Sequence, residues 1–381
     1  MTQAIVQFGT SRFLLAHAGL FISDALAGRA GATEALGGVT LVQTTDNPVS
    51  AARVAALAAG QGYPVIVRGL KNGLPVQETV QCMAVREALQ TANPADWRAL
   101  RTGVANGSVQ VILSNTADQG YLCDARDSAA ALADDAAAPF SYPAKLLVLL
   151  HGRWQLSPQS SISLLPCELI ERNGEALHGV VSQLAQDWHL PAAFVQWLAD
   201  HCIWANSLVD RIVSEAIDPV GAVTEPYALW AIQAQHGLIL PCSHPAMVVT
   251  DDLDHYERLK LFLLNAAHTY LADCWLRDQR PADETVLQAM EDAALRARLE
   301  AVWAEEILPV FGAMGTATRL EAERYVDDVR ERFLNPFLRH RLADIAQNHA
   351  DKIQRRVAPV LAAAQALGLS LSQSRLHGLL S

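Results

Sequence analysis

Residues 4–13 of the chain, AIVQFGTSRF, decide its fold class. The apolar run 4–8 has the length of a buried strand, Gly9 follows it, and residues 13–26 show the apolar spacing of a helix. The β-branched residues within 39–44 predict a second strand. A strand, a glycine turn, a helix and a strand in this order begin a βαβ unit. We therefore expect an α/β fold with a Rossmann-type, mostly parallel sheet.

The segments that follow extend this pattern. Lys71-Asn72-Gly73 stands between the strand-like runs 63–69 and 74–80, and the Asn-Gly pair predicts a hairpin because both residues tolerate positive φ. We expect this hairpin to be inserted in the main sheet, which would make that sheet mixed. Further strands are expected at 109–113, 161–165 and 203–205, and a helix at 193–200.

The second part of the chain has a different pattern of apolar residues. Beyond residue 251 the apolar residues recur with helical periodicity and almost no β-branched clusters interrupt them. We place the boundary near residue 248, after the Pro- and Gly-bearing stretch 236–245. The expected organisation is a dinucleotide-binding, Rossmann-type domain at 1–248, followed by an all-helical domain at 249–381 that carries the substrate and catalytic residues. Its long helices are expected at 251–275, 283–311, 317–333 and 336–367.

Composition restricts the class of partner. The chain has 29 basic and 40 acidic residues, a net charge of −11, and no separate basic cluster, which argues against a nucleic-acid partner. Residues 1–12, MTQAIVQFGTSR, lack the basic region followed by an apolar region that is typical of a secretory signal, and no apolar run has the ~20 residues that cross a membrane. Its six cysteines form no CxxC pair, which is typical of a reducing compartment. We expect a cytoplasmic protein with a small-molecule partner, and the oligomeric state stays open.

The helical segment 256–271, YERLKLFLLNAAHTYL, carries the strongest candidate for catalysis. At 100° per residue, Glu257, Asn265 and His268 fall within an arc of about 140° that begins at Lys260. Apolar surroundings favour a neutral amine, so a lysine here suits acid/base catalysis in a way that arginine cannot. Asn265 could polarise a carbonyl oxygen and His268 could orient a substrate. The alternative is a lysine with its stem on apolar surface and its charge in water.

This pattern, Lys260-x4-Asn265-x2-His268 preceded by Tyr256-Glu257, resembles a signature of the polyol-specific long-chain dehydrogenase/reductase family, the mannitol dehydrogenase family. Residues 206–213, NSLVDRIV, and 332–336, RFLNP, resemble two further motifs of that family. The resemblance implies a zinc-independent, NAD(P)-dependent oxidoreductase acting on CH–OH groups, with Lys260 as acid/base. In agreement, the histidines show no HxH or HExxH spacing, and no metal site is expected.

Other segments resemble the branch of tagaturonate and fructuronate reductases: 114–116, 141–146, 166–170 and 335–340. This implies a keto sugar acid and its aldonate as substrates. A carboxylate requires cations, and Arg332 suits it through bidentate hydrogen bonds. The candidate substrate residues are Glu168, Asn206, Asp210, Arg211, Arg332, His340 and Lys352. For the basic residues the alternative is an ordinary ion pair. For the protein the alternatives are a polyol or polyol-phosphate dehydrogenase of the family, or a non-catalytic sugar-responsive or scaffold protein.

The candidate cofactor loop departs from the family pattern. Gly9-Thr10-Ser11-Arg12-Phe13 resembles Gly-x-Gly-x-Phe, but Ser11 replaces the second glycine and Leu15 replaces an arginine. Asp46 could accept hydrogen bonds from the adenosine ribose and so favour NAD, with NADP not excluded, unless Asp46-Asn47-Pro48 is simply a turn. The candidate cofactor residues are Gly9, Ser11, Phe13, Asp46, Asn115 and Thr116, with Asn115 expected near the nicotinamide ribose.

Overall fold

The structure is a computed structural model that describes residues 2–45, 47–116 and 119–380. It divides into two compact units. The first comprises residues 1–67, 78–224 and 228–253, and the second comprises 68–77, 225–227 and 254–381. Two short excursions of the chain, at 68–77 and 225–227, therefore belong to the second unit. Asp46, a candidate cofactor residue, lies outside the described residues.

The first unit contains a six-stranded sheet in which all neighbouring strands are parallel. This confirms the α/β fold with a Rossmann-type sheet. The order β5-β2-β1-β6-β7-β8 places β1 between β2 and β6, so the direction in which strands are added changes at β1. Ligands of such sheets bind beyond the carboxyl ends of the strands at this point. The strands are β1 (Ile5–Phe8), β2 (Val39–Gln43), β5 (Val85–Gln90), β6 (Val111–Ser114), β7 (Ile162–Pro166) and β8 (Cys202–Trp204).

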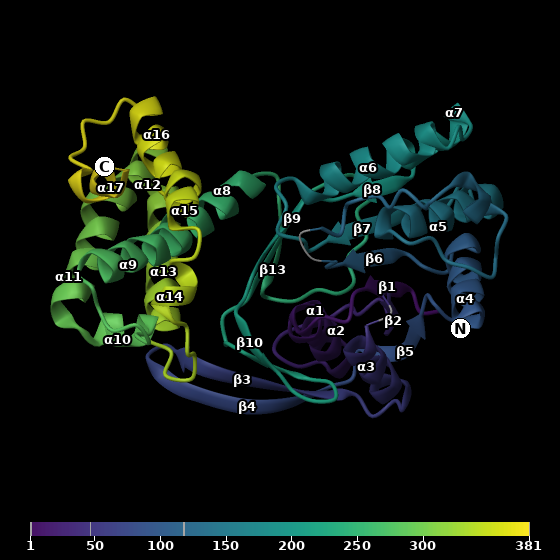
Figure 1. Cartoon of the computed structure of the whole chain (residues 1–381), viewed down its shortest axis with the longest axis horizontal. Coiled ribbons are helices and arrows are strands. Elements are labelled where there is room, and N and C mark those ends of the chain that lie inside the picture. The colour runs from purple at the N-terminus through teal and green to yellow at the C-terminus, as the bar shows by residue number, and fades with distance from the viewer. Residues whose placement is uncertain (1, 46, 117–118, 381) are drawn as a thin grey trace. The chain divides into compact units, whose positions relative to one another are not determined.

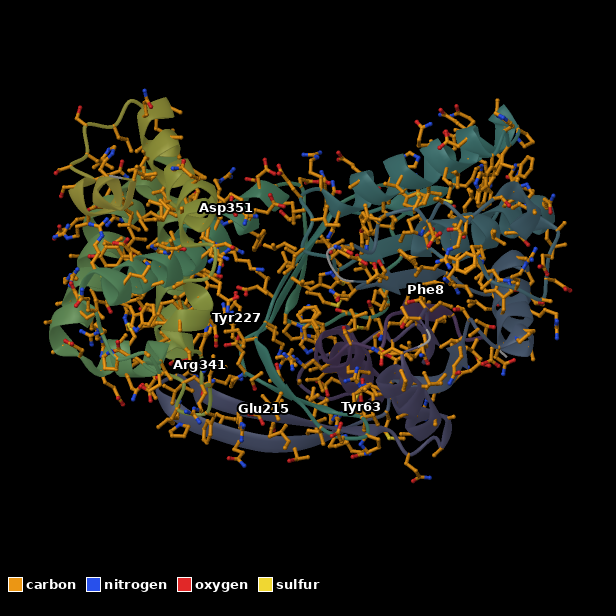
Figure 2. The ribbon with its side chains drawn as sticks, viewed as in Figure 1. Phe8, Tyr63, Glu215, Tyr227, Arg341 and Asp351 are labelled. Carbon is orange, nitrogen blue, oxygen red and sulfur yellow. The ribbon has the colours of Figure 1, made fainter. Side chains whose placement is uncertain are left out.

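Both faces of this sheet are buried, because alternate side chains of each strand enter different cores. Ile5 of β1 packs in a core with α2 (Ala18–Ala27) and α3 (Pro48–Ala58). Val6 and Phe8 pack on the opposite face, and Phe8 marks the carboxyl end of β1 in Figure 2. The helices of that second face, seen in Figure 1, are α4 (Pro94–Ala105), α5 (Tyr142–Leu156), α6 (Asn173–Asp187) and α7 (Ala192–Asp200).

The hairpin is confirmed, but its place in the main sheet was predicted wrongly. β3 (Tyr63–Lys71) and β4 (Leu74–Cys82) are joined by Asn72 and Gly73, which have φ of +53° and +73°. They form a separate sheet in the order β10-β11-β3-β4, with β10 (Val213–Ala216) and β11 (Ala222–Thr224). Alternate residues of β3, beginning at Tyr63, are buried in the core that also holds α2, so β3 buries its apolar face without joining the parallel sheet.

A third sheet completes the first unit. Its order is β13-β12-β9, formed by Met247–Thr250, Leu229–Gln233 and Ser207–Asp210. Of these three strands, only β13 lies where the sequence pattern, at 247–249, indicates a strand. The helix expected at 13–26 is interrupted at His17, which separates α1 (Arg12–Ala16) from α2.

The second unit is helical around one apolar core that includes Leu263, Leu271, Trp303 and Phe311. Helix α9 contacts α11, α14 and α15, and Figure 1 shows it running through this group. None of the described helices has the length and hydropathy needed to cross a membrane. The helices are α8 (Leu253–Arg258), α9 (Ala266–Arg277), α10 (Val286–Glu291), α11 (Ala293–Ala301), α12 (Leu308–Met314), α13 (Thr316–Phe333), α14 (Leu342–Ile345), α15 (His349–Arg356), α16 (Ala358–Ala366) and α17 (Ser374–Leu380), with π-helical turns at η2 (Leu259–Asn265) and η3 (Val302–Ile307).

Gly9 provides a test of how closely β1 and β6 approach. A Cβ atom at Gly9, where φ is +111°, would lie 2.7 Å from the backbone oxygen of Asn115, whereas a Cβ at Gly28, where φ is +62°, meets nothing within 4 Å. Both alanine replacements place a side chain at positive φ: at Gly28, in the left-handed helical region, this costs about 1–2 kcal/mol, and at Gly9, whose φ lies outside that region, it costs at least as much. Only Gly9→Ala adds the overlap, for which we expect a further loss of about 1–3 kcal/mol. Urea unfolding of the two variants measures the difference, and equal losses would contradict the close approach.

Candidate active site

The turn after β1 combines a close backbone approach with an unsatisfied hydroxyl. Asn115 N donates to Phe8 O over 3.2 Å, so the end of β6 lies directly beside the end of β1. Ser11 is the N-cap of α1, but its side chain makes no capping hydrogen bond. Its Oγ is buried and has no hydrogen-bond partner among the described residues. Two residues on, the Phe13 ring stacks on His17 with centroids 4.9 Å apart.

A cavity lies at the ends of β2 and β5. Its volume is about 600 Å³. The residues that line it come from the ends of these two strands, from the loop before α5 and from α5 itself; they include Thr44, Thr45, Thr91, Arg126, Phe140 and Lys145. Lys145 is buried, and its Nζ donates to Phe140 O over 2.6 Å. The first unit therefore offers a hollow next to the strand ends at which a dinucleotide is expected to bind.

Glu168 organises the loop that carries Asn115 and Thr116. Its carboxylate is buried and accepts hydrogen bonds from Thr116 N and Oγ1, each over 2.9 Å, from Ser114 Oγ over 3.0 Å and from Tyr121 Oη over 3.2 Å. Asn115 Nδ2 donates to Cys167 O over 2.7 Å. Because four donors from its own chain surround the Glu168 carboxylate, the geometry gives it a positioning role for this loop.

The other substrate candidates of the first unit also bond within it. Asn206 is buried, and its Nδ2 donates to Glu175 Oε1 over 2.9 Å and to Gln233 Oε1 over 2.7 Å. Arg211 Nη1 donates to Ala16 O, at the end of α1, over 2.8 Å. Asp210 is buried as the last residue of β9. These contacts connect helices and strands of the unit.

Lys260 and Asn265 lie in η2, a π-helical turn that the periodicity did not predict. In a π-helix the backbone bonds run from residue i to i+5, so residues five apart lie one turn apart on the same side. The five-residue spacing from Lys260 to Asn265 fits this turn better than the α-helical arc of 140°. Trp303 Nε1 donates to Leu263 O and Thr269 Oγ1 donates to Asn265 O, each over 3.0 Å, which satisfies carbonyl groups of the altered turn.

His268 lies one helical turn further on, at the centre of several predicted residues. It is 7% exposed, its ring stacks on Phe333 with centroids 4.4 Å apart, and the ring of His340 meets it edge-on at 4.9 Å. Burial holds the pKa of His268 well below its usual value, and the nearby cations, among them Arg332 and Lys352, lower it further. The imidazole is therefore neutral at physiological pH. Burial also lowers the pKa of His340.

Arg332 forms a buried ion pair that sequence patterns did not reveal. Its Nη2 lies 2.9 Å from Glu225 Oε1 and its Nε donates to Oε2 over 3.1 Å, with side chains 3% and 2% exposed. The Tyr227 ring centroid lies 4.4 Å from the guanidinium carbon (Figure 2). The forked edge that we expected to bind a substrate carboxylate thus binds Glu225. A buried arginine implies an acid, but nothing in the sequence shows which acid lies 107 residues away.

The described residues contain no group of three His, Cys, Asp or Glu side chains arranged to hold a metal ion.

A parallel sheet with a glycine turn at its switch point is typical of dinucleotide-binding proteins, and in this chain it is followed by a helical unit. The chain belongs to the mannitol dehydrogenase family. Residues 3–238 match the mannitol dehydrogenase Rossmann domain and residues 252–376 match the mannitol dehydrogenase C-terminal domain. This confirms the family resemblance, and the chain is an oxidoreductase.

Several curated relatives of the chain share one name. Proteins named altronate oxidoreductase are 31% identical in Klebsiella pneumoniae (strain 342), over 95% of this chain and 75% of theirs, and 30% identical in Bacillus subtilis (strain 168), over 94% and 74%. Two solved structures share the fold over 100% of this chain. A D-sorbitol dehydrogenase matches over 81% of its chain with a TM-score of 0.78 and 19% identity. The Pseudomonas fluorescens mannitol 2-dehydrogenase, in complex with NAD and D-mannitol, matches over 78% with 0.70 and 18%.

The buried ion pair allows a direct test. Replacing Glu225 with Gln leaves the Arg332 charge buried without its anion, which typically costs about 3–5 kcal/mol. The same change at Glu323, whose pair with Arg319 is largely exposed, is expected to cost less than about 1 kcal/mol. Unfolding in urea, followed by tryptophan fluorescence, measures both, and a Glu225→Gln loss no larger than that of Glu323→Gln would show that the pair contributes little.

Proposed function

We propose that the protein is an NAD-dependent, zinc-independent oxidoreductase that interconverts a keto sugar acid and its aldonate. The observation that carries this proposal is the placement of Lys260, Asn265 and His268 along one helical segment, with basic side chains gathered around His268. The printed name of the curated relatives, altronate oxidoreductase, supports a sugar acid as the substrate. In this proposal residues 1–248 bind the dinucleotide and residues 249–381 bind the substrate and catalyse the reaction.

The first unit fits a dinucleotide. Gly9 leaves room at the backbone where a Cβ would collide with Asn115, and the buried Ser11 Oγ has no partner in the described chain, as expected of a group that awaits a phosphate oxygen. The 600 Å³ cavity at Thr44, Thr45 and Thr91 offers space for the adenosine half. We propose that Phe13 covers the turn, that Asp46 binds the ribose hydroxyls, and that Asn115 and Thr116 lie at the nicotinamide ribose.

The chemistry divides between cofactor and protein. Nicotinamide would supply a hydride to the carbonyl carbon in reduction and accept it in oxidation. Lys260 Nζ gives a proton to the carbonyl oxygen in reduction and takes it from the hydroxyl in oxidation. Asn265 Nδ2 donates a hydrogen bond to the same oxygen as negative charge develops on it. His268 is neutral, so it can both donate to and accept from substrate hydroxyls.

Lys260→Ala tests the acid/base role. Loss of the amine is expected to lower kcat by about 10²–10⁴-fold, the usual contribution of a general acid or base. NADH binding, followed by its fluorescence, should be nearly unchanged because the cofactor residues lie elsewhere in the chain. Lys71→Ala is the matched control, since Lys71 is exposed in a hairpin turn. Wild-type turnover in Lys260→Ala would exclude the role.

Ser11→Ala tests the cofactor turn. In the protein without cofactor its buried hydroxyl has no partner, so its removal should leave the free energy of unfolding unchanged or raise it. If the hydroxyl donates to the pyrophosphate, its loss removes about 1 kcal/mol of binding and raises the Kd for NADH about 3–10-fold. Calorimetric titration measures the Kd, and an unchanged value would place the pyrophosphate away from Ser11.

A neutral polyol is the second candidate substrate, and the Arg332–Glu225 pair favours it. Because Glu225 occupies the forked edge of Arg332, the strongest carboxylate-binding group expected from the sequence is already satisfied. A substrate screen of hexuronates, hexitols, pentitols and their phosphates, with NADH or NAD, separates the two candidates.

A further inference from the structure

Basic side chains accumulate around His268 in the helical unit. His340, Arg332, Lys352 and Arg356 all act electrostatically on the His268 ring. Lys352 and Arg356 come from α15, which packs against α9, the helix that carries His268. They are four residues apart, so they lie on one face of α15, one turn apart. This cluster of five side chains is here called the basic cluster.

Two carboxylates act on members of the basic cluster: Glu225 forms the buried ion pair with Arg332, and Asp344 acts electrostatically on His340. Asp273, Asp344 and Asp351 form their ion pairs with residues outside the cluster, namely Arg277 and His349, Arg341, and Arg355. Arg356 is half-buried, and in the described part of the chain no carboxylate lies within ion-pair distance of it.

The hydrogen-bonding groups of the basic cluster are also incompletely used. Lys352 Nζ donates one of its three N–H groups to Ile345 O over 2.7 Å. His268 is more than nine-tenths buried, and its ring makes aromatic contacts but no hydrogen bond to any described residue. A half-buried arginine without a carboxylate partner, such as Arg356, is stabilised when an anionic ligand pairs with it. A planar guanidinium in this position is suited to a planar carboxylate.

We infer that Arg356, with Lys352 beside it, binds the carboxylate of the substrate and sets the preference for a sugar acid over a neutral polyol. Arg332 instead holds Glu225 and acts as a positioning residue. This inference rests on the proposed function. Its ligand chemistry is a carboxylate at the end of a polyhydroxy chain whose reacting carbinol reaches Lys260. Sequence patterns pointed to Lys352 but missed Arg356, because Arg355-Arg356 resembles an exposed basic end of a helix.

The test compares a ketohexuronate with the neutral ketohexose of the same configuration, using NADH and steady-state kinetics. In Arg356→Gln we expect the KM for the acid to rise at least tenfold with a smaller change in kcat. The ratio of kcat/KM for acid over neutral substrate should fall at least tenfold, and Arg356→Lys should restore part of it. Arg355→Gln is the matched control, since Arg355 is exposed and pairs with Asp351; it should retain the wild-type ratio.

A second measurement avoids turnover altogether. Gluconate, used as an aldonate probe without cofactor, should raise the melting temperature of the wild type and of Arg355→Gln but not that of Arg356→Gln. A fold check by circular dichroism accompanies each variant. Equal losses of kcat/KM on the acid and the neutral substrate leave the ratio of the two values unchanged. This result would overturn the inference while leaving the proposed function intact.

The substrate profile of the wild type distinguishes a wrong substrate class from a wrong assignment of Arg356. A wild type that reduces the neutral ketose and ignores the acid would overturn the proposed substrate class and this inference together. A phosphorylated ketose that is preferred to the acid, and loses that preference in Arg356→Gln, would overturn the carboxylate assignment in favour of a phosphate.

Discussion

The buried pair between Arg332 and Glu225 is the constraint on which the helical unit depends. Desolvating two charges is favourable only where the geometry holds both partners, and here two nitrogens of the guanidinium meet the two carboxylate oxygens below a tyrosine ring. Glu225 comes from 225–227, a three-residue excursion between β11 and β12. The pair therefore fixes this excursion against the end of α13, far away in sequence.

The same end of α13 also holds the other excursion, the tip of the β3–β4 hairpin. Glu331 accepts hydrogen bonds from the backbone amides of Asn72 and Gly73, and Asn335 Nδ2 donates to Arg68 O over 3.4 Å. A Cβ at Gly69 would lie 2.9 Å from the Asn335 amide, so glycine is needed there. The RFLNP segment, one of the family motifs, thus assembles the helical unit from three separate parts of the chain.

Local signals predicted the elements that local forces determine. The apolar run before Gly9 and the Asn72-Gly73 turn specify β1 and the hairpin through backbone preference alone, and both are present. The pairing of β3 with β11 was not predictable, because it depends on residues more than 150 positions apart. The π-helical turn at Lys260 was missed because its apolar residues also satisfy α-helical spacing, and its stability comes in part from a hydrogen bond donated by Trp303.

In the candidate site, too, residues that are close in sequence were predictable and partners from distant segments were not. Lys260, Asn265 and His268 could be predicted as a group because one helical segment carries them, and in the structure the ring of His340 lies beside that of His268. Partners contributed by distant segments, such as Glu225, left no signal in the sequence.

The charges of the basic cluster affect both the protonation of His268 and the kind of substrate that can bind beside it. Burial and neighbouring cations keep His268 neutral, and the same cations that disfavour its protonation favour an anion at that place. An anion bound by Arg356 would offset part of the effect that these cations have on the pKa of His268. Burial is the larger cause of the lowered pKa, and a bound substrate does not remove it. The imidazole therefore stays neutral with a sugar acid as with a neutral polyol, and the charge of the substrate would be recognised by the guanidinium of Arg356 and not by His268.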